Sequence, residues 1–131
     1  RCCVRRCHHC RRDRRCVRCG ILAVEAAKQA SQEGRKLEVI DLRSLSPLDM
    51  ATVYESVRRT TRAIVVQEAP RTQGVGAEIA ARLGEELYYV MEAPVLRVTG
   101  WSTPYPPAKA EGEHIPDVDR ILDAVDRSLA F

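Results

Sequence analysis

The sequence predicts an α/β fold, a three-layer sandwich in which helices cover both faces of a mostly parallel sheet. From Ile21 onward, helical and strand-like patterns alternate along the chain. The strand-like runs are short, apolar and rich in branched residues, as in strands that are buried on both faces. With 131 residues, the chain is long enough for one domain with its own core.

The first half of this pattern contains two helices and one strand. A helix is predicted over residues 21–33, where apolar side chains recur at helical spacing and Gly34 follows as a C-terminal glycine. The run KLEVIDL is predicted as a buried strand. The next helix should begin with Ser46 as its N-cap and Pro47 in its first position.

The second half continues the alternation. RAIVVQE is predicted as a strand, and GVGAEIAARLGEELYYV as a helix entered through Gly74 and Gly76. APVLRVTG is predicted as a third strand that opens at Pro94. A proline-rich irregular stretch follows, and DVDRILDAVDRSLAF has the apolar stripe of an amphipathic helix.

The segment 1–20 differs in composition from the rest of the chain. It holds all six cysteines and eight arginines and carries a net charge of +7, whereas residues 21–131 contain no cysteine and carry a net charge of −4. A sheet with three crossovers should begin with a strand before its first helix, but this segment is the least strand-like part of the chain. We therefore expect the first strand to be missing or replaced and residues 1–20 to be disordered.

Three interpretations of residues 1–20 remain open: a zinc site, a disordered basic tail, and a segment translated in a shifted reading frame. Two CxxC pairs, formed by Cys7, Cys10, Cys16 and Cys19, favour zinc. Only five residues separate the pairs, however, whereas structural zinc sites usually separate them by about 12 to 20. The shifted reading frame is the preferred interpretation, so no metal site is predicted. If the segment did bind zinc, these four cysteines would be the ligands.

The charge and hydropathy patterns argue against several function classes. The acidic body has no stripe of clustered Lys and Arg, which argues against a nucleic-acid partner. No run of about 18 apolar residues predicts a membrane span, and no membrane partner is expected. The start of the chain lacks the apolar region of a secretory signal and the body has no cysteine pairs, so a cytoplasmic location is predicted.

Three stretches carry a family resemblance: EVIDLRSLSPLD, VVQEAPRTQGVGAEIAARL and APVLRVTGWSTPYPPA. Through them, residues 21–131 resemble the C-terminal domain of the β subunit of 2-oxo acid dehydrogenase decarboxylating components, a domain shared with the transketolase superfamily. The closing PYPPAKAEGEHIPDVDRILDAVDRSLAF looks most like the branched-chain type.

The resemblance implies thiamine diphosphate chemistry, with magnesium, in the parent complex. In that family the cofactor lies between an α subunit and the N-terminal half of the β subunit, and this sequence has no diphosphate-binding GDG run with a downstream Asn. The chain is therefore expected to bind no cofactor and to be inactive by itself. The implied partners are an α subunit and a second β subunit of a heterotetramer, and the acyltransferase core component.

The candidate interface residues come from two segments. The proline-rich loop is stiff and partly apolar, as in loops that supply aromatic anchors to an interface. In the family, acidic groups near the C-terminus face basic residues of the core component's binding domain. The candidates are Trp101, Tyr105, Pro106, Pro107, Asp123, Asp126 and Phe131.

Other residues have competing interpretations. Gly74 and Gly76 precede a helix and could bind an anion there, but close helix–strand packing is the preferred reading. Glu68 ends a strand at the edge where α/β sheets place ligands. His114 lies in a polar loop without a visible partner, so no catalytic residue is predicted. The alternative function is an independent binding module with a zinc- or nucleic-acid-binding head.

Overall fold

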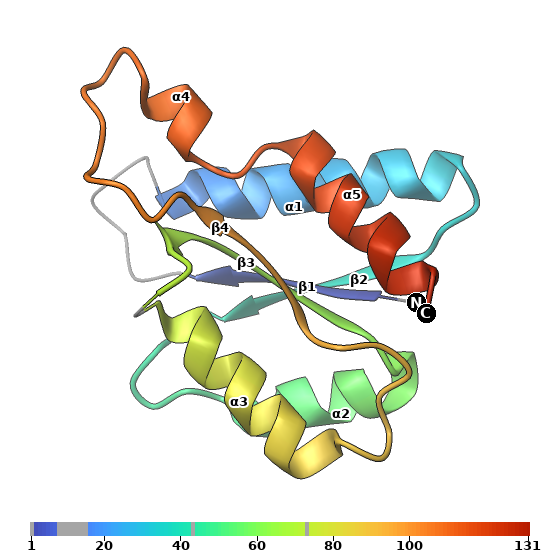
Figure 1. The fold of residues 1–131 in the computed structure, drawn as a ribbon. Coiled ribbons are helices and arrows are strands. Elements are labelled where there is room, and N and C mark those ends of the chain that lie inside the picture. Colours follow the sequence, from blue (N-terminus) through green and yellow to red (C-terminus); the bar gives the residue numbers. More distant parts are fainter. Residues whose placement is uncertain (1, 8–15, 43, 73) are drawn as a thin grey trace.

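The computed structural model describes residues 2–7, 16–42, 44–72 and 74–131, with the backbone alone for 2–7 and 16–19. Figure 1 shows the elements in chain order from blue to red. They are β1 (Cys2–Cys7), α1 (Cys16–Gln32), β2 (Leu37–Leu42), α2 (Met50–Thr60), β3 (Ala63–Pro70), α3 (Val75–Leu87), β4 (Leu96–Gly100), α4 (Glu111–His114) and α5 (Val118–Leu129).

The described strands form one sheet between two layers of helices. The strand order is β2-β1-β3-β4, and each neighbouring pair is parallel. Helices α1 and α5 cover one face of the sheet, and α2 and α3 cover the other (Figure 1). The predicted α/β three-layer sandwich with a parallel sheet is confirmed.

Of the two alternatives expected for the first strand, missing or replaced, the first is wrong, because the Cys- and Arg-rich segment itself forms a strand in that position. Strand β1 pairs with β2 along its whole length, from Cys2 opposite Leu37 to Cys7 opposite Leu42, and it also pairs with β3. Sheet pairing joins main-chain groups that every residue except proline carries, so a chain position between two strands can be filled by an unusual sequence. Disorder is predicted over the whole of residues 1–20. Within that segment, residues 16–20 belong to α1, whereas residues 1 and 8–15 lie outside the described residues.

Strand β3 supplies both halves of the core. Ile64 and Val66 point to the layer of α1 and α5, whereas Ala63 and Val65 point to the layer of α2 and α3. All four side chains are buried, as expected of an inner strand whose two faces are covered. The other buried members of the first cluster are Ala23, Ala26, Val98, Ile121, Ala124 and Val125, and those of the second are Leu42, Met50, Val53, Val57, Ile79, Leu83 and Leu87.

Helix α2 begins later than its sequence predicts. Leu45 and Leu48 form an isolated antiparallel bridge, which keeps the chain in a turn beyond the expected N-cap, Ser46. The carboxylate of Asp49 instead accepts a hydrogen bond from the backbone N–H of Thr52, at 3.1 Å. Asp49 is therefore the N-cap, and the expectation for Ser46 is wrong.

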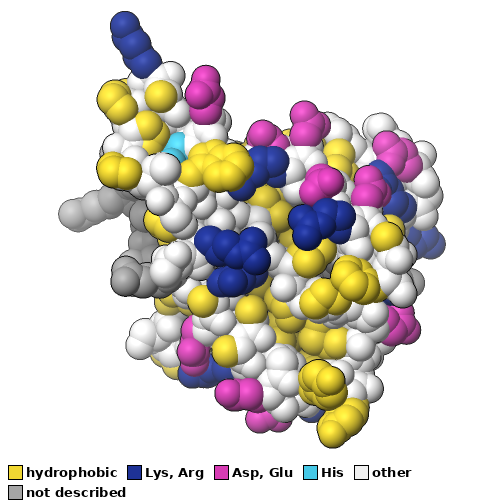
Figure 2. Space-filling model, in the orientation of Figure 1, with side chains coloured by type: hydrophobic (Ala, Val, Ile, Leu, Met, Phe, Trp, Pro, Cys, Tyr) yellow, Lys and Arg dark blue, Asp and Glu magenta, His cyan; other side chains and the backbone are white. Residues whose placement is uncertain are grey.

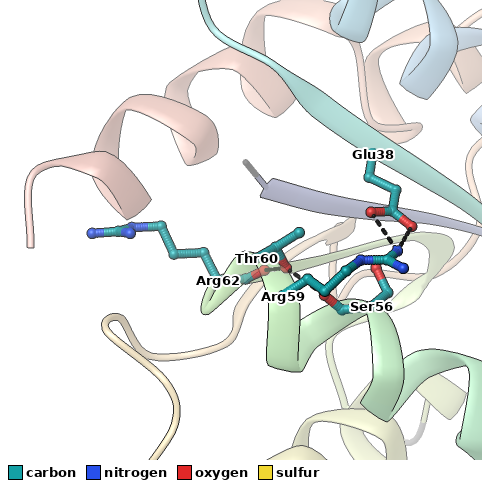
Figure 3. A network of polar contacts seen from close by, with 5 residues as sticks. All are labelled: Glu38, Ser56, Arg59, Thr60 and Arg62. Carbon is teal, nitrogen blue, oxygen red and sulfur yellow. Dashed lines mark hydrogen bonds and ion pairs between the residues drawn. The ribbon is translucent and has the colours of Figure 1, made fainter.

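A polar network fixes the passage from α2 into β3 (Figure 3). The Arg59 guanidinium donates to both carboxylate oxygens of Glu38, at 2.8 and 3.1 Å, and so joins α2 to β2. The buried Thr60 hydroxyl lies within hydrogen-bond distance of the carbonyls of Ser56 and Arg62, at 3.1 and 3.2 Å. These contacts orient β3 as it enters the sheet.

Replacing Ile64 by alanine should lower the free energy of unfolding by about 2–5 kcal/mol, because the mutation leaves a cavity beneath α1 and α5. Ile21→Ala is the matched control: its side chain is 59% exposed and its loss should change stability by no more than about 0.5 kcal/mol. Urea unfolding followed by circular dichroism measures both. Equal losses in the two variants would contradict the assigned core.

Candidate functional site

Trp101 follows β4 and stands in the predicted interface loop at the carboxyl end of the sheet. Its side chain is 54% exposed, yet two contacts hold it. The indole N–H donates to the carbonyl of Glu113 at 3.0 Å, and the guanidinium of Arg120 lies 4.6 Å from the ring centroid. An exposed aromatic ring held by a hydrogen bond and a cation–π contact has the properties of an interface anchor.

The other aromatic residue of this loop, Tyr105, packs edge-on against His114, with 5.2 Å between ring centroids. Its hydroxyl donates to the carboxylate of Glu111. His114 is only 4% exposed, so the expected place in a polar loop is wrong. The imidazole of His114, at the end of α4, packs against Gly100. A Cβ added to Gly100 would lie only 3.1 Å from the imidazole Nε2. The contacts give His114 a packing role.

The C-terminal candidates lie on and after α5. The Asp126 carboxylate binds the guanidinium of Arg35, and the Asp123 carboxylate lies 3.8 Å from Arg127. Both acids are thus paired with arginines of the same chain, which partly offsets their charge. Phe131 is 71% exposed at the end of the chain.

The structure does not bring the seven candidates together. The Trp101 loop, residues 101–107, meets α5 at Arg120 in its first turn, whereas Phe131 follows the opposite end of that helix. A helix of 12 residues is about 18 Å long. The candidates therefore form two surfaces, the Trp101 loop and the C-terminal acidic face of Asp123, Asp126 and Phe131. These surfaces adjoin along α5, because Asp123 lies one helical turn from Arg120.

Arg120 is the residue at the Trp101 loop that sequence reasoning did not single out. Its guanidinium donates to the carbonyl of Thr99 at 2.6 Å while it stacks on Trp101, so it ties α5 to the end of β4. One clue was present: an arginine in the first turn of a helix opposes the macrodipole. An arginine at such a position suggests a contact with another segment of the fold, which here is the end of β4 and Trp101.

The far end of α5 is held by Arg62, at the start of β3. Its Nε donates to the carbonyl of Ser128 at 2.9 Å, and its guanidinium also binds the carboxylate of Glu92. This hydrogen bond from Arg62 lowers the pKa of Glu92 below its usual value. Arg62 thereby links the C-terminal end of α5, beside the acidic face, to the start of β3.

The glycines at the start of α3, the N-cap Gly74 and Gly76 in its first turn, serve packing, as predicted. The Gln67 side-chain oxygen accepts from the backbone N–H of Gly76 at 2.8 Å, and its amide nitrogen donates to Pro70 at 2.9 Å. A Cβ added to Gly74 would lie 2.1 Å from the Gln67 side-chain nitrogen, and one added to Gly76 would lie 2.6 Å from the Gln67 side-chain oxygen. The first turn of α3 is thus occupied by the chain's own amide, in place of an external anion. Glu68 is half-buried near the carboxyl edge, and β3 runs two residues further than expected, to Pro70.

No group of three or more His, Cys, Asp or Glu side chains is arranged to hold a metal ion within the described ranges. The side chains of Cys7, Cys16 and Cys19 are outside the description, and so is all of Cys10. The zinc alternative thus receives no support. None of the described helices is long and apolar enough to cross a membrane.

Two glycine-to-alanine changes in α3 should have opposite effects. Gly76→Ala should lower the free energy of unfolding by about 1–3 kcal/mol, because its Cβ would lie 2.9 Å from Val65 Cγ1 and displace Gln67. Gly84→Ala meets nothing within 4 Å and should raise it by about 0.5–1 kcal/mol. Chemical denaturation of both variants tests this, and stabilisation by Gly76→Ala would contradict the packing.

With this geometry established, comparisons identify the family. Residues 21–121 match the family described as "Transketolase, C-terminal domain". The chain is 57% identical over 110 residues to the pyruvate dehydrogenase E1 component subunit beta of Leifsonia xyli, covering 84% of this chain and 33% of that protein. It is 52% identical over 108 residues to the 3-methyl-2-oxobutanoate dehydrogenase subunit beta of Mycobacterium tuberculosis, covering 82% and 31%.

Among solved structures, a "split gene transketolase, inactive beta4 tetramer" matches 98% of this chain and 38% of its own, with a TM-score of 0.77 and 26% identity. The chain spans about a third of the length of the two curated relatives named above. It belongs to the transketolase C-terminal domain family, and β subunits of 2-oxo acid dehydrogenases are among its relatives.

Proposed function

We propose that this chain is the C-terminal assembly and docking domain of a 2-oxo acid dehydrogenase β subunit. The observation that carries this proposal is the Trp101 ring, which is exposed and yet held by Glu113 and Arg120. A ring that is already fixed loses little conformational freedom when a partner covers it, and such aromatic anchors dominate interface energy. The two relatives at 57% and 52% identity support the assignment to this enzyme class.

The proposed substrate is a branched-chain 2-oxo acid. This rests on the closing stretch from Pro104 to Phe131, which resembles the branched-chain type. The relatives include both a pyruvate and a 3-methyl-2-oxobutanoate dehydrogenase subunit, so their identities support the wider class of 2-oxo acids. Comparing kcat/KM for pyruvate and 3-methyl-2-oxobutanoate in the reconstituted parent enzyme would decide between them.

The proposed cofactor of the parent enzyme is thiamine diphosphate with magnesium. A magnesium ion of this kind needs carboxylate and other oxygen ligands. This sequence has no GDG run with a downstream Asn, the feature that holds the diphosphate in the family it resembles. We therefore assign the cofactor to other parts of the parent complex and propose that this domain contributes no catalytic residue.

The two surfaces suit different partners. The Trp101 loop is apolar and stiff, so we assign it to contacts with the α subunit and a second β subunit. The acidic face carries Asp123 and Asp126, and we assign it to a basic binding domain on the acyltransferase core. Phe131 lies beyond the opposite end of α5 from Arg120, which would let a partner bind there beside one at the Trp101 loop. The proposed location of the complex is the cytoplasm.

Trp101→Ala, placed in the β subunit that carries this domain, should raise the dissociation constant of its complex with the α subunit at least tenfold. The change removes the anchor and leaves the carbonyl of Glu113 without its donor. Tyr89→Ala is the control, because Tyr89 is 98% exposed on the α3 side of the domain. Analytical ultracentrifugation measures assembly, and thermal melts show whether both variants fold. Unaltered assembly of a folded Trp101→Ala variant would refute the anchor.

Neutralising the acidic face with Asp123→Asn and Asp126→Asn should weaken binding to the core's binding domain several-fold at 50 mM salt. The effect should shrink at 500 mM, because the Debye length is more than about 10 Å at 50 mM salt and falls to between about 3 and 10 Å at 500 mM. Glu55→Gln, an exposed acid on α2, is the matched control. Calorimetric titration at both salt concentrations is the measurement. A loss of affinity that is the same at both would exclude an electrostatic contact.

A further inference from the structure

We propose that a pocket between β4 and α5 binds an oxyanion the size of phosphate. The pocket has a volume of about 200 Å³. Four of the side chains that line it are arginines and one is an acid, so it carries a net charge of +3. These five residues are Arg71, Arg97, Arg120, Asp123 and Arg127. The pocket shares Arg120 and Asp123 with the two proposed contact surfaces, but phosphate binding to it requires neither partner.

The arginines converge from three parts of the chain. Arg71 follows β3 directly and Arg97 belongs to β4. Arg120 and Arg127 lie seven positions apart on α5, which places them two turns apart on one side of the helix. Figure 2 shows Lys and Arg side chains gathered over β4 and the adjoining part of α5, at the exposed edge of the sheet.

Arg120 has a donor that the described residues leave unused. One terminal nitrogen donates to Thr99, but the other, Nη1, is buried without a hydrogen-bond partner in the described part of the chain. A buried donor of this kind needs an explanation, and Arg120 also lines the arginine-rich pocket. Because Nη1 itself is buried, an oxyanion would bind the more accessible guanidinium groups of the pocket, such as that of Arg127, which is exposed.

The neighbouring cations are only partly compensated. The Arg127 guanidinium lies 3.8 Å from Asp123, a distance too long for a strong hydrogen bond, and Arg97 donates to the backbone carbonyl of Arg71 at 3.1 Å. Guanidinium groups match the oxygens of phosphate in geometry and form charge-assisted hydrogen bonds with them. The small volume fits a single anionic group, and a phosphate dianion offsets most of the +3 charge.

The test is a calorimetric titration of the 131-residue chain with inorganic phosphate at constant ionic strength, with sodium chloride as the reference anion. We expect saturable binding of one phosphate. Arg97→Gln and Arg127→Gln should each raise the dissociation constant at least fivefold. Arg58→Gln, which removes an exposed arginine from α2 on the other side of the sheet, should leave it unchanged.

The exposed position of Arg127 keeps the test valid if Arg97→Gln fails to fold. Glycerol phosphate in a parallel titration separates two sources of the same chemistry. Tighter binding of glycerol phosphate would assign the pocket to a phosphate ester, and weaker binding to free phosphate. No saturable phosphate binding beyond that of chloride, or the same dissociation constant in Arg127→Gln and Arg58→Gln, would overturn the proposal.

Discussion

The structure depends on strand β3, which is buried on both faces and paired on both edges. Its residues alternate between two cores, with Ile64 and Val66 toward α1 and α5, and Ala63 and Val65 toward α2 and α3. On its edges it pairs with β1 and β4. A one-residue shift in its register would move each of these side chains to the opposite layer, so the positions of the helices depend on the pairing of this strand.

The arrangement of α3 and the Trp101 loop at the carboxyl edge of the sheet depends on the last residues of β3. Gln67 bonds the first turn of α3, which fixes the angle at which that helix leaves the sheet. Beside it, Gly100 lets β4 approach within contact of the Glu68 carbonyl, where any larger residue would clash. Trp101 follows at once, and Arg120 secures it from α5. The interface loop is thus positioned by packing in the interior, although its own residues are largely exposed.

Folding brings together charged side chains that are far apart in the sequence. Residues 21–131 carry a net charge of −4 and no basic run, yet the fold gathers Arg71, Arg97, Arg120 and Arg127 around one pocket. On the C-terminal acidic face, Asp126 instead meets Arg35 from before β2. Local potential depends on which elements are neighbours, because charges interact over a few ångströms in space regardless of their distance in sequence.

The sequence by itself determined the α/β class, the strand at Leu37–Leu42, the amphipathic last helix and the packing role of the α3 glycines. Those features are local, since hydrophobic period and residue size are properties of short segments. Tertiary structure alone decided that Cys2–Cys7 forms a central strand, that His114 is buried, and that Arg120 supports the Trp101 loop. Each depends on main-chain pairing or on a contact between distant segments, and neither leaves a periodic pattern in the sequence.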